Sequence, residues 1–259
     1  MRFVDTHIHL DDTRYEADRE ALIARATEAG VGTLVTIGTD LADSKWAADF
    51  VEGRKNVYGT VGQHPERVGE YDEGRLDEFR RAAQRPGIVA IGEVGLDYHS
   101  PGFDAPAQRR LFGQMIGMAR DLRLPLVIHN RDAGPDTLAM LRERWDLGLG
   151  GVFHCFAGDQ ATADGALALG FDLAVGGVLT YKNAQPLRDI IATVPLERLV
   201  LETDGPWLAP QAWRGKRNEP AYMVSVAAQL AQIKGVGVEA VAAQTTANAM
   251  RLFKLEGNA

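Results

Sequence analysis

The chain has 259 residues, of which 46% are apolar and 24% are charged, a composition typical of ordinary globular proteins. Its formal net charge is −7, so it lacks the excess of basic residues that a long groove for duplex nucleic acid normally carries. A small phosphate site is still compatible with this charge, because bound cations can supply the positive charge locally. The single cysteine, Cys155, excludes an intramolecular disulfide and fits a reducing compartment.

The sequence has no sign of a membrane or export segment. No apolar run approaches the roughly 18 residues that a membrane span needs. The N-terminus enters an apolar strand at once, which leaves no room for a signal peptide. We therefore expect a cytoplasmic protein that binds no membrane and requires no obligate protein partner.

Short apolar runs alternate with helical patterns along the whole chain. Apolar and β-branched composition predicts strands at residues 3–9, 33–37, 57–61, 88–93, 125–129, 151–154, 171–175 and 199–202. Apolar spacing and glycine or proline stops predict helices at residues 13–29, 43–53, 72–85, 106–122, 133–145, 159–169, 185–193, 220–233 and 238–254. This alternation is typical of parallel strands joined by crossover helices.

The number of strands and the length of the chain decide between two architectures. Eight strands in a chain close to the usual barrel size of about 250 residues favour a (β/α)8 TIM barrel. An open doubly wound sheet is the alternative. No linker, low-complexity segment or internal repeat interrupts the chain, so we predict one domain over residues 1–259.

The first predicted strand ends in two histidines, His7 and His9. Alternate side chains of a strand point to the same face, so these two imidazoles can share one metal ion. A single His-x-His motif is weak evidence for a metal site, because short motifs often occur by chance. Its value depends on whether the rest of the chain supplies further ligands.

Further ligand types stand at the ends of later strands. Glu93 ends the fourth predicted strand, His129 the fifth and His154 the sixth, and Asp204 follows the eighth. The C-terminal strand ends of a barrel converge on one face. We therefore predict a metal site formed by His7, His9, Glu93, His129, His154 and Asp204.

This donor set suits Zn²⁺, Mn²⁺ or a related ion and is large enough for two ions bridged by one carboxylate. A single histidine at a strand end is more often a hydrogen-bonded polar residue. However, burying Glu93 beside Asp204 without a cation would be costly.

Three further residues are candidates for contacts with a substrate phosphate: His64, Asn130 and Arg131. His64 follows the third predicted strand, and a structural histidine before Pro65 is an equally good interpretation. Arg131 offers the fork of donors that phosphates and carboxylates accept, although an ordinary surface salt bridge is the alternative.

The loop after the eighth predicted strand contains the basic residues Arg214, Lys216 and Arg217. A solvated loop is the default interpretation, but next to a cationic site these residues could steer a polyanion. Tyr98 and Trp207 also fall on loops at the strand ends, where aromatic rings can stack on bases. Packing in the core explains these two rings at least as well.

Seven segments resemble those of the TatD family of metal-dependent hydrolases, within the amidohydrolase-like superfamily. They are residues 5–9, 62–65, 92–98, 128–131, 154–158, 201–208 and 214–220, which span nearly the whole chain in the family's order. Two positions depart mildly: Gln63 precedes His64, and Ala157 stands where the family often has Ser or Thr. Neither is a ligand position, so the departures bear on substrate preference.

The resemblance implies a barrel and a deoxyribonuclease-like phosphodiesterase that uses divalent ions, often Mg²⁺ or Mn²⁺ and in some members Zn²⁺. Members include 3′–5′ exonucleases acting on single-stranded ends. Others are linked to DNA repair or to hydrolysis of D-aminoacyl-tRNA. DNA is thus the expected substrate, with RNA or aminoacyl-tRNA as possible substrates.

The family pattern also implies roles for individual residues. One ion would be held by His7, His9, Glu93 and Asp204, and a second by Glu93, His129 and His154. Glu93 and Asp204 would be catalytic, with Asp204 taking a proton from the attacking water.

The alternative is a D-aminoacyl-tRNA deacylase or a small-molecule amidohydrolase, whose carbonyl chemistry needs the same Lewis acid and hydroxide. A non-catalytic metal-binding barrel is disfavoured, because a scaffold has no need of open metal positions.

Overall fold

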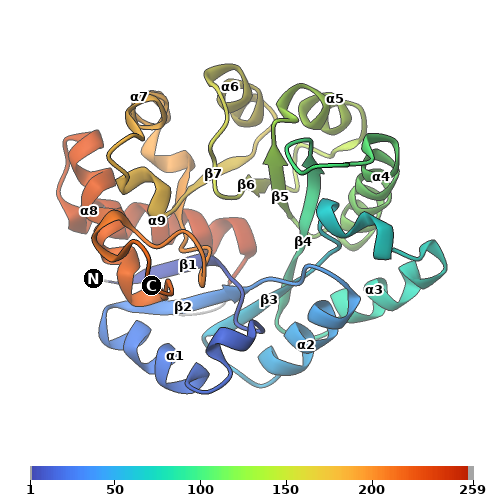
Figure 1. The fold of residues 1–259 in the computed structure, drawn as a ribbon, viewed down its shortest axis with the longest axis horizontal. Coiled ribbons are helices and arrows are strands. Elements are labelled where there is room, and N and C mark those ends of the chain that lie inside the picture. The colour runs from blue at the N-terminus through green and yellow to red at the C-terminus, as the bar shows by residue number, and fades with distance from the viewer. Residues whose placement is uncertain (1, 256–259) are drawn as a thin grey trace. The chain divides into compact units, whose positions relative to one another are not determined.

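The computed structural model describes residues 2–255, in which strands and helices alternate along the chain (Figure 1). The strands are β1 (Phe3–Ile8), β2 (Val31–Thr36), β3 (Val57–Val61), β4 (Ile88–Asp97), β5 (Leu126–Arg131), β6 (Gly151–Phe153), β7 (Asp172–Val175) and β8 (Leu199–Leu201). The helices are α1 (Arg19–Glu28), α2 (Leu41–Val51), α3 (Leu76–Ala83), α4 (Ala105–Leu122), α5 (Gly134–Arg144), α6 (Gln160–Ala168), α7 (Gln185–Thr193), α8 (Met223–Lys234) and α9 (Val238–Phe253). Short 3-10 turns occupy several of the connections.

The eight strands form one sheet, and their order in it is their order in the chain, from β1 to β8. A doubly wound sheet would reverse its strand order at a switch point. β1 also lies against β8, and a parallel bridge joins Ile8 to Gly205 in the loop after β8. The fold is therefore a (β/α)8 TIM barrel, as predicted, and the doubly wound alternative is wrong.

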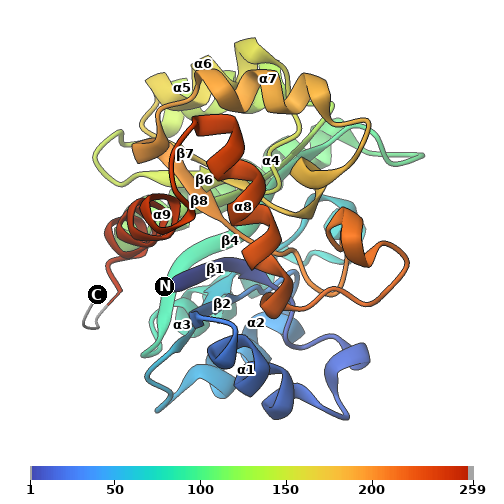
Figure 2. The ribbon, with the colours of Figure 1, turned by 90° about the vertical axis from the view of Figure 1, so that its left-hand side faces the viewer.

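Contacts within the chain define two compact units, and the first comprises residues 2–36 and 173–255 of the described chain. In it β1 pairs in parallel with β2, and β7 with β8. Helices α8 and α9 pack on each other, and α9 lies against β1 and β8 (Figure 2). Its buried core includes Val4, Ile8, Leu34, Leu199 and Leu201.

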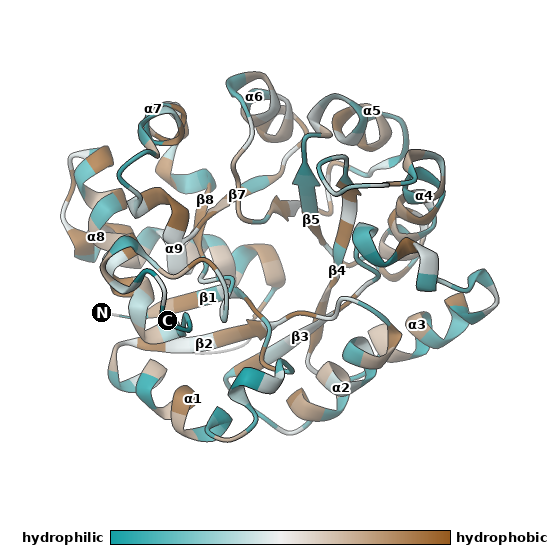
Figure 3. Cartoon of the chain, in the orientation of Figure 1, coloured by the Kyte–Doolittle hydropathy of each residue, from teal (hydrophilic) through white to brown (hydrophobic). Residues whose placement is uncertain are grey.

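The second unit comprises residues 37–172 and contains the parallel strands β3, β4, β5 and β6. Ile91, Val94, Leu126 and Ile128 are fully buried in its core. The strands are mostly apolar, but β5 ends in the hydrophilic sequence His-Asn-Arg, which is teal in Figure 3. Polar residues thus gather where β5 ends. The prediction that both units form one domain stays a prediction.

β4 is longer than the sequence predicted. Its pairing with β5 is interrupted between Ile91 and Val94 and then continues to Asp97, so Glu93 lies inside the strand and not at its end. Gly95 makes this continuation possible. It has φ +147°, and a Cβ there would lie 1.9 Å from the carbonyl oxygen of His129. Only glycine fits this position without strain.

Aspartate caps define several helix starts. Asp40, Asp104 and Asp159 each accept a hydrogen bond from the backbone N–H three residues on, at the starts of α2, α4 and α6. The helix predicted from residue 13 begins only at Arg19, because Thr13–Tyr15 forms a separate 3-10 turn. In residues 2–255, no helix combines the length and the apolar character needed to cross a bilayer.

Candidate metal centre

Two of the predicted ligands lie at the end of β1. His7 is the fifth residue of the strand, and His9 follows it by two positions, so the two side chains share a face. Their Nε2 atoms lie 3.2 Å apart, and both residues are buried. Two buried imidazole nitrogens that face each other at this distance are well placed to share a cation.

Asp204 lies beside this pair because backbone hydrogen bonds join the end of β1 to the loop after β8. The Asp204 N–H donates to the carbonyl of His7 at 2.9 Å, and the His9 N–H donates to the carbonyl of Gly205 at 2.8 Å. Asp204 adopts a left-handed conformation (φ +56°), which aspartate tolerates better than most residues. Its Oδ1 is 3.4 Å from Nε2 of His9 and 3.7 Å from Nε2 of His7. We call His7, His9 and Asp204 the first cluster.

Asp5 holds the backbone behind the first cluster. Its carboxylate accepts hydrogen bonds from the backbone N–H of His7 at 3.2 Å and of Thr203 at 2.9 Å. The Thr203 hydroxyl donates to it as well. Asp5 is fully buried, and this burial raises its pKa to about 7. Asp5 therefore ties β1 to the loop that carries Asp204.

Glu93, on β4, is the centre of a second group of ligands. The others are His64 after β3, His129 on β5 and His154 after β6. Its Oε1 lies 2.9 Å from Nδ1 of His129, 2.9 Å from Nε2 of His154 and 3.3 Å from Nε2 of His64. Glu93 is only 3% exposed. We call His64, Glu93, His129 and His154 the second cluster.

Sheet pairing explains this arrangement. His129 on β5 is in register with Gly95 on β4, and the backbone N–H of His154 donates to the carbonyl of Ile128 at 3.0 Å. These bonds fix the height of each side chain along the strands, so the three elements deliver their ligands to one carboxylate oxygen.

Burial alone would raise the pKa of Glu93, but the histidine charges and hydrogen bonds around it outweigh burial and hold this pKa well below its usual range. Burial lowers the pKa of His64. Burial would also lower the pKa of His129, but its hydrogen bonds to Asp97 and Glu93 outweigh that effect and raise it. The environment thus favours an ionised Glu93, the form that binds a cation.

Asp97, at the end of β4, orients His129. Its Oδ2 lies 2.9 Å from Nε2 of His129, and its Oδ1 accepts the backbone N–H groups of His99 and Ser100, each at 2.9 Å. A carboxylate on one ring nitrogen keeps the proton there and leaves the other nitrogen as a lone-pair donor. The other nitrogen is Nδ1, which lies 2.9 Å from Oε1 of Glu93 and would give up its proton when a metal ion binds, so the second cluster fits a metal ion.

Both clusters have donor sets that divalent cations accept. The first offers two imidazoles and one carboxylate, and the second offers three imidazoles and one carboxylate. Ligand atoms of the first cluster, and of His64, Glu93 and His129 in the second, lie close enough together to share an ion. Asp97 was not predicted to contact the ligands, although it stands in the 92–98 segment on which the family resemblance rests. Its position could have revealed this role, because Asp97 stands at the end of β4 once the strand is extended past Glu93.

The predicted phosphate contacts have different environments. His64 belongs to the second cluster, and its Nδ1 also accepts the backbone N–H of Glu66 at 3.2 Å, as a structural histidine before Pro65 would. Its contact with a substrate phosphate stays a prediction. Asn130 accepts a hydrogen bond from the hydroxyl of Thr137 at 2.8 Å. Arg131 is exposed, and no ion pair engages its side chain among residues 2–255.

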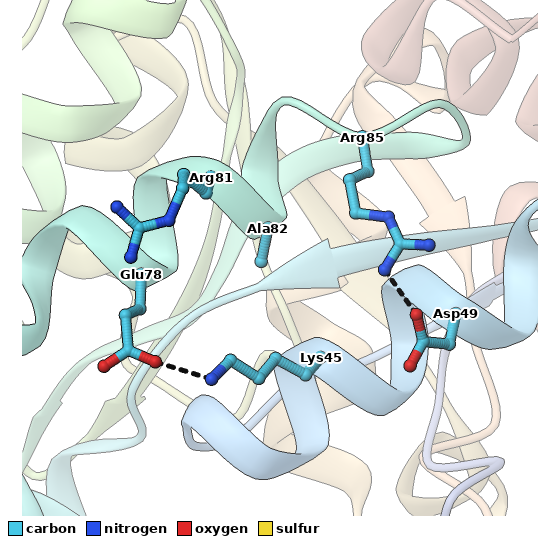
Figure 4. Close-up of a pocket in the computed structure, with 6 residues that line it drawn as sticks. All are labelled: Lys45, Asp49, Glu78, Arg81, Ala82 and Arg85. Atoms are coloured by element: carbon cyan, nitrogen blue, oxygen red, sulfur yellow. Dashed lines mark hydrogen bonds and ion pairs between the residues drawn. The ribbon is translucent and has the colours of Figure 1, made fainter.

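A surface pocket of about 370 Å³ lies between α2 and α3 (Figure 4). It is lined by Lys45, Asp49, Glu78, Arg81, Ala82 and Arg85. Lys45 pairs with Glu78 at 2.6 Å, and Arg85 pairs with Asp49. Because none of the predicted ligands lines this pocket and its charges are largely paired, we do not assign it to the site.

Comparisons with known proteins agree with the donor chemistry. The family model described as "TatD related DNase" matches residues 4–254. The uncharacterized metal-dependent hydrolase YcfH of Escherichia coli is 41% identical over 261 aligned residues, covering 100% of this chain and 98% of the relative. A protein of Erwinia amylovora named "3'-5' ssDNA/RNA exonuclease TatD" is 33% identical over 258 residues, covering 97% of this chain and 99% of the relative.

The solved structures show the same likeness. The crystal structure of YJJV, a TatD homolog from Escherichia coli, matches with a TM-score of 0.93 and 29% identity, covering 98% of this chain and 99% of that one. The family model, the relatives and this structure each span nearly the whole chain. This protein therefore belongs to the TatD family of metal-dependent hydrolases.

Proposed function

We propose that this protein is a divalent-metal-dependent deoxyribonuclease that removes nucleotides from the 3′ ends of single-stranded DNA. The observation that carries the proposal is the buried carboxylate oxygen of Glu93, with three imidazole nitrogens within 3.3 Å. The name of the Erwinia amylovora relative supports the choice of substrate, and RNA is a second possible substrate on the same ground.

The ligands divide between the two clusters. His7, His9 and Asp204 would hold one ion, and Glu93, His129 and His154 would hold another. When bound, such ions supply hydroxide at neutral pH and neutralise charge that develops on the phosphoryl oxygens. That Glu93 is a ligand of both ions stays a prediction from the family pattern.

Asp204 is the proposed proton carrier. Its side chain is 14% exposed, so one face of the carboxylate is open to a substrate while the other faces the histidine pair. The bond between the water oxygen and phosphorus would form as the bond to the leaving 3′ oxygen breaks, and Asp204 would move the proton from the water to that oxygen.

His64, Asn130 and Arg131 are proposed to bind the phosphate. His64 has its Nε2 at the second cluster, and the two others follow His129 on β5. Arg131 offers an exposed guanidinium, which can bind two phosphate oxygens at once.

The test uses metal-stripped protein resupplied with Mg²⁺, Mn²⁺ or Zn²⁺ and incubated with end-labelled single-stranded or duplex DNA. We expect a ladder that shortens from the 3′ end of single strands and that depends on the metal. Asp204→Asn should lose turnover and keep its fold. Asp189→Asn, which changes an exposed carboxylate on α7, is the matched control and should keep turnover.

Metal content is measured in the same samples. His7→Ala should lose bound metal together with activity, because it removes a ligand of the first cluster. Full turnover in Asp204→Asn would show that Asp204 is not the proton carrier. Absence of DNA cleavage with every ion would overturn the nuclease proposal, and D-aminoacyl-tRNA would then be the next substrate tried.

A further inference from the structure

An exposed indole lies beside the first cluster. The ring centroid of Trp207 is 4.7 Å from that of His9, with the two rings at 84° to each other. The backbone N–H of Trp207 donates to the carbonyl of Asp204 at 2.9 Å. Trp207 is nevertheless 43% exposed. An exposed aromatic ring next to a polar site is the feature on which single-stranded nucleic acids stack their bases.

Arg14 lies over the same indole. Its guanidinium carbon is 4.5 Å from the ring centroid of Trp207, a cation–π contact. Asp12 orients the guanidinium, because Nε and Nη2 of Arg14 donate to its two carboxylate oxygens, each at 2.8 Å. The third nitrogen, Nη1, makes no hydrogen bond to another part of residues 2–255. Arg14 thus presents a fixed donor to a ligand that approaches the ring.

The backbone on both sides of this pair is held in place. Nδ2 of the buried Asn218 donates to the carbonyls of Thr203 and Trp207, at 2.8 and 2.7 Å. Arg217 donates to the carbonyl of Arg14 at 2.6 Å and forms a two-pronged ion pair with Asp18. A surface that is already rigid loses little conformational entropy when it binds a ligand.

We propose that Trp207 and Arg14 form a nucleotide subsite beside the first cluster, in which the indole stacks on a base and the guanidinium binds a backbone phosphate. This rests on the proposed nuclease function. The two contacts place the guanidinium within about 9 Å of the His9 ring. A stacked strand rises about 3.4 Å per nucleotide, so the bound phosphate would lie at most two or three nucleotides from the cluster.

The test is a double-mutant cycle between protein and DNA. A short single strand is made with one abasic position, moved nucleotide by nucleotide from the 3′ end. KM is measured with Mn²⁺-loaded wild-type protein and with Trp207→Leu. Base stacking of ordinary strength predicts a 5- to 150-fold rise in KM, roughly, for either change alone. At the stacking position the two changes together should cost no more than one of them. Trp207→Phe, which keeps an aromatic face, should recover most of the loss.

The phosphate contact is tested in the same way. Arg14→Gln is combined with a strand in which one phosphate is replaced by a neutral methylphosphonate. At one position, the substitution and the replaced phosphate together should raise KM no more than one of them alone. Arg214→Gln is the matched control, since Arg214 is also exposed and lies over an aromatic ring, that of Tyr181, at 4.3 Å. For Arg214→Gln the effects should add at every position.

Additive effects of Trp207→Leu and base removal at every position would overturn the subsite. Loss of bound metal in Trp207→Leu would also overturn it, because the indole would then act by supporting His9. If wild-type protein cleaves no DNA, the nuclease proposal fails, and the same cycles are measured as Kd by fluorescence anisotropy. Coupling in Kd would then support the subsite, and additive or undetectable binding effects would reject it.

Discussion

Asp97→Asn tests whether the second cluster is a metal site in which Asp97, a residue outside the cluster, orients the ligand His129. Asparagine has nearly the same volume, and its amide oxygen can still accept the backbone N–H groups of His99 and Ser100. Its NH2 group would then face Nε2 of His129 at the present 2.9 Å contact. The imidazole would respond by carrying its proton on Nδ1, the atom that faces Glu93.

The expected cost is a 10- to 100-fold loss of metal affinity, roughly, as for other groups that orient a ligand histidine. This corresponds to about 1.4–2.7 kcal/mol of binding free energy. The assay is calorimetric titration of metal-stripped protein with Mn²⁺ or Zn²⁺. Asp136→Asn is the matched control, because Asp136 accepts hydrogen bonds from Tyr98 and Arg109 outside the second cluster. Equal affinity in Asp97→Asn and wild type, with an unchanged fold, would refute the reasoning.

Three other predictions concern the fold around the clusters. Gly95→Ala should lower the free energy of unfolding, measured in urea, by about 3 kcal/mol or more, because the added Cβ meets the carbonyl of His129. Gly32→Ala is the control: nothing lies within 4 Å of the added Cβ, so the loss should be about 1 kcal/mol or less. A cost near zero for Gly95→Ala would contradict the observed strand pairing. Asn218→Ala should cost about 1–3 kcal/mol, because it leaves two carbonyls without their donor; unfolding measurements that show no loss would count against the anchored loop. Hydrogen bonds from Arg217 and Arg25 lower the pKa of Asp18 in the folded protein, so its contribution to stability is present above its unfolded pKa and is lost as the pH falls through the folded one. The Tm difference between wild type and Asp18→Asn should therefore be seen at pH 7 and shrink toward pH 3, and a difference that does not change with pH would be inconsistent with this ion pair.

The sequence was sufficient to predict the barrel, because the strands are mostly apolar runs and most helices begin at a cap or end at a glycine. β3 and α7 have the predicted bounds, 57–61 and 185–193. The length of β4 could not be predicted from an apolar run. Its last residues alternate glycine with apolar and acidic residues, and only their pairing with β5 makes them a strand.

The site was predictable to the extent that ligand types stood at strand ends. His7 with His9, and His129 with His154, follow from that rule, and the rest depends on contacts between strands. His64 was ambiguous because a histidine before a proline has a local explanation, and only its 3.3 Å approach to Glu93 places it in the second cluster. The pairing of Arg14 with Trp207 joins residues 193 positions apart in the chain, and no local pattern signals it.

We propose that this chain uses divalent ions to remove nucleotides from single-stranded 3′ ends. The most direct measurement follows a 5′-labelled single strand with metal-stripped protein before and after addition of Mn²⁺. We expect no products before addition and a ladder of strands shortened one nucleotide at a time afterwards. An intact strand after addition, or a ladder of equal intensity in the presence of excess chelator, would contradict it.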